Sequence, residues 1–156
     1  MIDDSTERRH YAFMRARIGA HNRRRRVMLA VMPQTPHQRA EAELTAHGLT
    51  FPETTVGPAW QTTRALYVKK KMFCVFGEKG QRLDALTVLM KLPISAEMAE
   101  ELDFVRPAKG WYKQNKWVTA YFGPEDDVLA EMPTLKGWLK QSYIAVAPKT
   151  LGRTLT

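Results

Sequence analysis

The chain has 156 residues and carries 24 Lys and Arg against 16 Asp and Glu, which gives a net charge of +8 at neutral pH. Hydrophobic residues make up 44% of it, too many for a disordered chain, yet no apolar run approaches the roughly 18–20 residues of a membrane-spanning helix. The single cysteine, Cys74, excludes an internal disulfide framework and a multi-cysteine zinc site. These properties predict a soluble, cytoplasmic protein that does not contact membranes.

Much of the positive charge lies at the N-terminus. Residues 1–31 contain eight arginines and three acidic residues, a net of +5, whereas the rest of the chain carries +3. The densest cluster consists of Arg23, Arg24, Arg25 and Arg26. These arginines could hold phosphates, because each neutralised phosphate releases counterions. They could instead belong to a solvated tail or to a segment upstream of an alternative start at Met32, which the charge-run rule favours, or to a targeting signal.

The composition divides the chain into three parts. We expect residues 1–31 to form a basic N-terminal extension that is disordered or partly helical. Residues 32–150 are expected to form the domain, and residues 151–156 a C-terminal tail.

The domain is expected to open with a helix over residues 35–47. Thr35 can accept a hydrogen bond from an unpaired N–H, Pro36 suits the first helical position, and Gln38 can complete a capping box. The residues spaced to share its buried face are Ala40, Leu44 and His47. Gly48 then supplies a stop.

Alternating hydrophobic residues predict an antiparallel meander in the next part of the chain. Its three strands are expected at residues 64–69, 71–76 and 86–92, with a turn at Gly77–Gly80. In the middle strand, one face should carry Met72, Cys74 and Phe76 and the other Phe73 and Val75. Apolar side chains on both faces favour a central place in the sheet.

The second half of the domain is expected to add a strand and further helices. A short helix over residues 96–102, capped by Ser95, should direct Met98 and Leu102 inward. The segments that follow are a long loop at 105–115, a strand at 116–122, a helix beginning at the acidic residues 125–127, and a last helix at 134–147. The stripe of that last helix comprises Leu135, Trp138, Leu139, Ser142, Tyr143 and Val146. This order predicts an α+β two-layer sandwich, an antiparallel sheet with helices packed on one face.

Short motifs in a fixed order resemble one family. They are Trp60, Lys71-Met72-Phe73, Arg106-Pro107-Ala108, Lys116-Trp117-Val118, Ser142-Tyr143, Val146-Ala147 and Lys149. Over residues 35–150 the chain is similar to the MmcQ/YjbR-like family of small bacterial proteins. The resemblance implies a fold related to that of CyaY, the bacterial frataxin, and DNA binding through a double-wing motif. The Arg-rich residues 1–31 depart from the family pattern, in which the first helix lies near the start.

The sequence contains no recognisable catalytic constellation or metal-binding motif. Cys74 lies mid-strand with no histidine nearby in sequence, so we expect a buried structural thiol. The four histidines, which follow no metal-binding pattern, are His10, His21, His37 and His47. We therefore expect a monomeric binding module without enzymatic activity and without a cofactor.

Cations in two segments support the hypothesis of DNA binding. Residues 77–82 and 105–116 could act as two wings, whose cations meet phosphates while an aromatic ring stacks or wedges against bases. The candidate contacts are Lys69, Lys70, Lys79, Arg82, Arg106, Lys109, Lys113 and Lys116, with Trp111 as the ring and Arg23–Arg26 adding affinity. Trp111 could instead pack within the domain, and Trp117 is expected in the core.

A second hypothesis assigns the aromatic residues to a ligand-binding cleft. Its candidate lining is Trp60, Tyr67, Lys71, Phe73, Arg106, Trp111, Ser142 and Tyr143. Apolar clefts with a few polar groups bind small molecules. A third hypothesis is a protein-interaction module that uses an exposed sheet edge or an aromatic patch.

Overall fold

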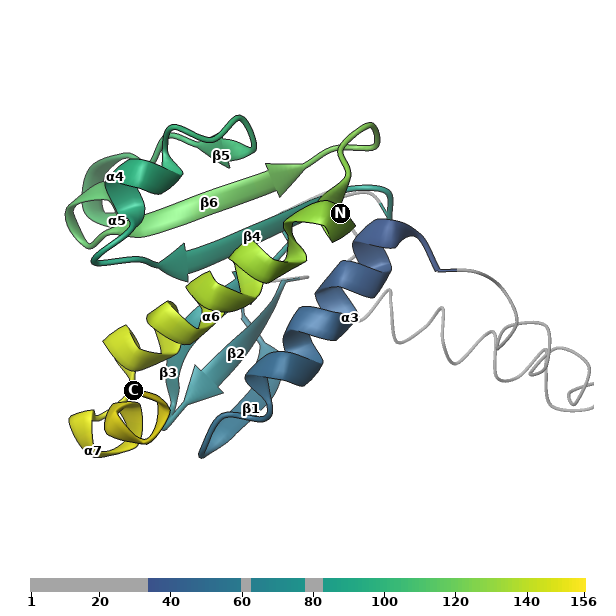
Figure 1. The fold of residues 1–156 in the computed structure, drawn as a ribbon. Helices are drawn as coiled ribbons and strands as arrows, with labels where there is room; N and C mark the ends of the chain where they lie inside the picture. Colours follow the sequence, from purple (N-terminus) through teal and green to yellow (C-terminus); the bar gives the residue numbers. More distant parts are fainter. Residues whose placement is uncertain (1–33, 60–62, 78–82) are drawn as a thin grey trace, which may run out of the picture.

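The computed structural model describes residues 34–59, 63–77 and 83–156, which form a sheet with helices on one side (Figure 1). The strands are β1 (Thr54–Pro58), β2 (Arg64–Val68), β3 (Lys71–Phe76), β4 (Leu86–Lys91), β5 (Val105–Arg106) and β6 (Trp117–Phe122). They form one six-stranded antiparallel sheet in the order β1-β2-β3-β4-β6-β5. The predicted α+β sandwich is confirmed.

The helices vary widely in length. They are α3 (Pro36–Gly48), α4 (Ala96–Ala99), α5 (Gly110–Gln114), α6 (Met132–Val146) and α7 (Lys149–Gly152), with short 3₁₀ helices at Val128–Glu131 (η1) and Arg153–Leu155. Figure 1 shows α3 and α6 lying across the same face of the sheet. Residues 151–156 continue the domain as the end of α7 and the last 3₁₀ turn, and Leu151 and Leu155 pack against the core.

The start of α3 follows the predicted capping box. The Thr35 hydroxyl accepts a hydrogen bond from the Gln38 N–H at 3.1 Å, and the Gln38 side chain accepts one from the Thr35 N–H at 3.0 Å. The end of the helix differs from the prediction, because Gly48 is its last residue and Leu49 is the C-cap. A Cβ at Gly48 would lie only 2.5 Å from Leu66 Cδ1, so this glycine allows α3 to approach β2 closely.

A bulge in the sheet changes which residues of β3 face the helices. The register with β2 shifts between Leu66 and Tyr67, so Phe73 and Cys74 both enter the core. The ring of Phe73 packs edge-on against Tyr143 of α6 at 5.4 Å. The prediction that Phe73 shares a face with Val75 was therefore wrong, since strict alternation does not hold across a bulge.

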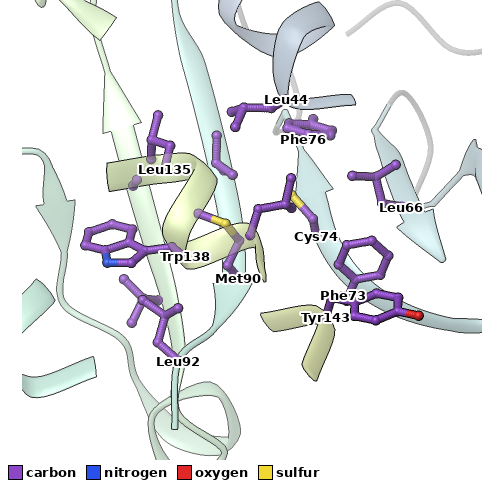
Figure 2. Packing of buried hydrophobic residues seen from close by; sticks show 14 of the residues in the cluster. Leu44, Leu66, Phe73, Cys74, Phe76, Met90, Leu92, Leu135, Trp138 and Tyr143 are labelled. Atoms are coloured by element: carbon purple, nitrogen blue, oxygen red, sulfur yellow. The ribbon is translucent and has the colours of Figure 1, made fainter. Parts of the chain in front are cut away.

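The predicted stripe of α6 forms the centre of the core (Figure 2). Five of its six members are buried, namely Leu135, Trp138, Leu139, Ser142 and Tyr143, while Val146 is only partly buried; Met132, before the predicted start of the helix, is buried as well. The Ser142 hydroxyl donates to the Phe73 carbonyl and accepts from the Lys91 N–H at 2.8 Å, so it ties α6 to both β3 and β4. Cys74 is fully buried, and burial, followed by the charge of Glu41, raises the pKa of its thiol well above the ordinary value. The predicted structural thiol is confirmed.

The short helix α4 is smaller than predicted and faces the other way. Its buried residues are Ala96 and Ala99, whereas Met98 and Leu102 are exposed. Ser95 makes no capping hydrogen bond; its hydroxyl accepts from the side-chain amide of Gln141 at 2.9 Å. The contact with α6 thus sets the rotation of this single turn, which the apolar pattern could not reveal.

Three other segments also differ from the predictions. The expected loop at 105–115 contains β5 and α5, and β1 is an additional strand at the sheet edge. The acidic residues begin no α-helix: Asp126 accepts from the Gly123 N–H at 2.6 Å, and Asp127 caps η1 by accepting from the Ala130 N–H. Within the described ranges, no helix has both the length and the apolar character needed to span a bilayer.

Candidate nucleic-acid interface

Two lysines form the tight turn between β2 and β3. Val68 pairs with Lys71, so Lys69 and Lys70 are the whole connection. Both have left-handed backbones, with φ of 48° and 68°. Such a turn favours Asn-Gly, because other L-residues lose roughly 1–2 kcal/mol each in this conformation. The turn therefore places two ammonium groups at one end of the sheet in a conformation unfavourable for lysine.

A third left-handed lysine, Lys116, follows α5 with a φ of 61°. Glycine is the usual residue at this position after a helix. The Lys116 N–H donates to the Lys113 carbonyl at 3.2 Å, and its own carbonyl accepts from the Leu92 N–H at 2.8 Å. These bonds fix the lysine between α5 and the end of β4.

The strand pairing brings these lysines to the same end of the sheet. Because neighbouring strands are antiparallel, the β2–β3 turn, the end of β4 and the start of β6 share one end, and Lys91 pairs with Trp117 there. We call the exposed lysines at this end the lysine end: Lys69, Lys70, Lys71, Lys109, Lys113 and Lys116. Figure 1 shows α5 and the tip of β2 at this end.

The lysines of this end differ in how they are paired. Lys69 contacts Glu53 at 3.1 Å, and Lys116 lies 4.0 Å from Glu97. Exposed pairs of this kind contribute about 0–1 kcal/mol, so they yield readily to a competing anion. Within the described ranges, Lys70, Lys109 and Lys113 form no ion pair.

Two aromatic side chains stand beside the lysines of α5. Trp111 is 61% exposed and Tyr112 is 40% exposed, and their rings meet edge-on at 5.3 Å. No residue of α5 is buried, so the interpretation of Trp111 as packed within the domain was wrong. Trp117 is only partly buried and lies outside the core cluster, because β6 directs it to the face opposite the helices. Its prediction as a core residue was also wrong.

The two predicted wings do not join the sheet at the same end. β3 ends at Phe76 and β4 begins at Leu86, so the connection containing residues 77–82 leaves the sheet opposite the lysine end. The segment that shares the lysine end with residues 109–116 is therefore the β2–β3 turn and not the predicted second wing. Some candidates, namely Arg23–Arg26, Trp60, Lys79 and Arg82, lie outside the described residues.

Arg106 occupies a different position from the lysines. It pairs with Thr119 in the middle of β6, and its guanidinium lies 3.8 Å over the ring of Tyr121. This contact is a cation–π interaction that keeps the charge over the sheet.

The predicted aromatic cleft is not formed by its described members. Phe73, Ser142 and Tyr143 are fully buried in the core, where Tyr143 donates a hydrogen bond to the Pro52 carbonyl at 2.7 Å. The Tyr67 hydroxyl donates to the Pro58 carbonyl at 2.5 Å. A cavity of about 440 Å³ lies elsewhere, lined by Asp103, Phe104, Arg106, Tyr121, Phe122, Asp126, Asp127, Ala130 and Glu131. Arg106 is the one residue that belongs both to the predicted cleft and to the lining of this cavity.

The YjbR family matches residues 49–145, well over half of the chain. The chain belongs to the YjbR family. The region shared with YjbR runs from the segment before β1 into the last turn of α6, so it includes all six strands. No curated protein matches the chain.

Across the described residues, no group of three or more His, Cys, Asp or Glu side chains is placed to hold a metal ion.

Proposed function

We propose that this YjbR protein is a non-enzymatic module that binds DNA through the phosphate backbone, with the lysine end as its contact surface. One observation carries the proposal. In the described chain, four non-glycine residues have a positive φ, and three of them are Lys69, Lys70 and Lys116. Glycine or asparagine would suit these backbones better, so the three lysines stand there at a conformational cost, which favours a role for their charge.

Phosphate binding follows from the chemistry of these side chains. Each lysine presents a compact positive charge on a flexible stem, which suits a phosphate but reads no base. Trp111 and Tyr112 add exposed rings that can stack or wedge against bases next to the contacted phosphates. We propose a monomer acting in the bacterial cytoplasm, with little preference for DNA sequence.

The direct experiment is fluorescence anisotropy with labelled DNA at increasing salt. Binding should be clear at low salt, and the logarithm of the association constant should fall linearly with the logarithm of salt concentration, by about 0.9 per phosphate contact on duplex DNA. Undetectable or salt-independent binding would contradict the proposal.

A truncated chain that starts at Met32 separates the domain from the Arg-rich extension. If the domain holds the site, the truncated chain keeps binding with a smaller salt slope, because Arg23–Arg26 no longer contribute contacts. Complete loss of affinity would assign DNA binding to the extension and exclude the lysine end.

A second candidate function is small-ligand binding in the 440 Å³ cavity beside β6, whose volume lies in the range of ligand pockets. Four carboxylates line it, from Asp103, Asp126, Asp127 and Glu131, and they favour a cationic ligand. A thermal-shift screen of organic amines tests this candidate, since a ligand that binds only the folded state raises Tm.

A further inference from the structure

The sheet has a second face, opposite the helices, with an unusual composition. Residues paired in register point to the same side, so the core residues identify both faces. The strand residues of the second face are Thr55, Gly57, Ala65, Tyr67, Met72, Val75, Thr87, Leu89, Lys91, Arg106, Trp117, Thr119 and Tyr121. They include three aromatic and two cationic side chains and no carboxylate.

No described helix buries a side chain against this face. The buried residues of α3, α4 and α6 belong to the core on the other side, and α5 buries none. Exposure on the second face is uneven, since Ala65, Val75 and Thr87 are buried. The partly exposed residues of its β4–β6 half are Leu89, Lys91, Trp117, Thr119 and Tyr121. Together with Arg106 we call them the aromatic platform.

The platform offers flat stacking surfaces beside positive charge. Trp117 and Tyr121 lie four residues apart on β6, about 14 Å at roughly 3.4 Å per residue, with the small Thr119 between them. The Arg106 guanidinium lies 3.8 Å over the ring of Tyr121, so positive charge stands directly beside an aromatic side chain of the platform. Lys91 is the register partner of Trp117 and carries the charge toward the lysine end.

The six residues of the platform supply aromatic rings and positive charge and no carboxylate of their own, which suits a polyanion with exposed π-faces, although Arg106 and Tyr121 also line the cavity that contains four acidic residues. Duplex DNA hides the faces of its bases, and its major groove admits a helix or a two-stranded ribbon but not a broad sheet. Single strands expose their bases, and sheet surfaces with aromatic side chains stack them. We propose that the aromatic platform binds single-stranded nucleic acid, an inference that rests on the proposed phosphate binding at the lysine end.

The charges around the platform favour one path for a bound nucleic-acid strand across the sheet. Asp103 and Asp126 line the cavity that also contains Tyr121, so carboxylates border the platform at the end of β6. The lysine end borders it at the start of β6, beside Trp117. Phosphates are repelled from the first border and attracted to the second. The strand therefore passes from Arg106 and Tyr121 over Trp117 to the lysines.

The test measures anisotropy of labelled oligothymidylate of about 20 nucleotides, which exceeds the few nucleotides covered by one domain. The same sequence annealed to its complement is the duplex control. We expect tighter binding of the single strand, and Trp117→Ala should weaken it roughly 5- to 150-fold, the range for loss of one stacked base. Trp117→Phe keeps a ring and should retain most of the affinity. Oligouridylate in a parallel arm identifies the preferred sugar, and tight binding of either single strand supports the proposal.

A charge variant keeps the test valid if Trp117→Ala does not fold. Thr119→Glu places a carboxylate at the centre of the platform and should weaken single-strand binding, whereas Thr134→Glu on α6 makes the same change in the helix layer and should not. Folded Trp117→Ala and Thr119→Glu proteins that bind oligothymidylate like the parent would overturn the proposal. In that case, loss of binding in lysine-end variants would leave the phosphate-binding function standing. If neither oligonucleotide binds at low salt, both proposals are wrong.

Discussion

Glu53 and Lys69 form an ion pair of 3.1 Å between two residues that both have left-handed backbones. The pair links the residue before β1 to the β2–β3 turn, and both side chains are about half exposed, 53% and 54%. In the free protein, the Glu53 carboxylate is therefore paired with Lys69, one of the lysines that we propose to bind phosphate. Under the proposed function, a phosphate that binds Lys69 has to displace the Glu53 carboxylate.

Glu53→Gln should strengthen DNA binding, because it frees Lys69 and removes a nearby negative charge. The gain should reach up to about fivefold, the equivalent of the 0–1 kcal/mol of an exposed pair, with little change in stability. Glu43→Gln is the matched control, since Glu43 pairs with Lys136 on the helix layer at 3.9 Å. Anisotropy titrations of the two variants compare them directly, and weaker binding by Glu53→Gln would contradict this displacement.

Replacing Lys69 and Lys70 in the turn should raise the stability of the protein and weaken its binding to DNA. The double variant Lys69→Asn/Lys70→Gly suits the left-handed turn, so the free energy of unfolding in urea should rise by about 1–2 kcal/mol or more. The same variant should bind DNA more weakly, because two cations are lost. A variant that is no more stable than the parent would show that the lysines cost the fold nothing.

Gly48 of α3 and Gly137 of α6 should respond to alanine in opposite directions. Gly48→Ala should destabilise the protein, because a Cβ 2.5 Å from Leu66 Cδ1 forces a shift in a packed core, at about 1–3 kcal/mol. Gly137→Ala on α6 meets no atom within 4 Å and should stabilise by about 0.5–1 kcal/mol. Urea unfolding of both variants measures the difference. Equal effects would show that α3 does not approach β2 as closely as described.

His47 should make stability depend on pH. Burial, followed by the charge of Lys136, lowers its pKa in the folded protein. The unfolded chain therefore binds the proton more tightly, so this contribution is present above the unfolded pKa of about 6.5 and is lost as the pH falls below it. His47→Gln should lessen the loss, as followed by urea midpoints across this range. An equally steep loss in the variant would exclude His47 as its source.

The parts of the fold that were predicted correctly depend on signals within one segment. The capping box of Thr35 and Gln38 and the apolar stripe of α6 are complete in a few turns of sequence. The bulge at Phe73 and the orientation of α4 depend on packing against α6, which no local pattern contains. β1 is an edge strand with few apolar residues, so alternation gave no signal for it.

The sequence predicted cationic residues of the candidate site, but it predicted them as two wings at 77–82 and 105–116, which do not join the sheet at the same end. Lys69, Lys70, Lys113 and Lys116 were chosen for their charge, yet their shared end of the sheet follows from the pairing of β4 with β6. The sequence did contain one further signal. A two-residue connection between antiparallel strands requires a tight turn, so the Lys-Lys pair between them predicts two lysines with left-handed backbones. The second face of the sheet became apparent only from the register.

The salt dependence of DNA binding by Lys70→Gln/Lys113→Gln tests the central claim most directly, since neither lysine forms an ion pair with a described residue. Each lysine that contacts a phosphate should lower the log–log slope by about 0.9 on duplex DNA, so the double variant should lose about 2. Lys136→Gln/Lys140→Gln on α6 removes the same charge and should leave the slope nearly unchanged. Equal slopes in the two double variants would show that the lysine end is not the DNA-binding surface.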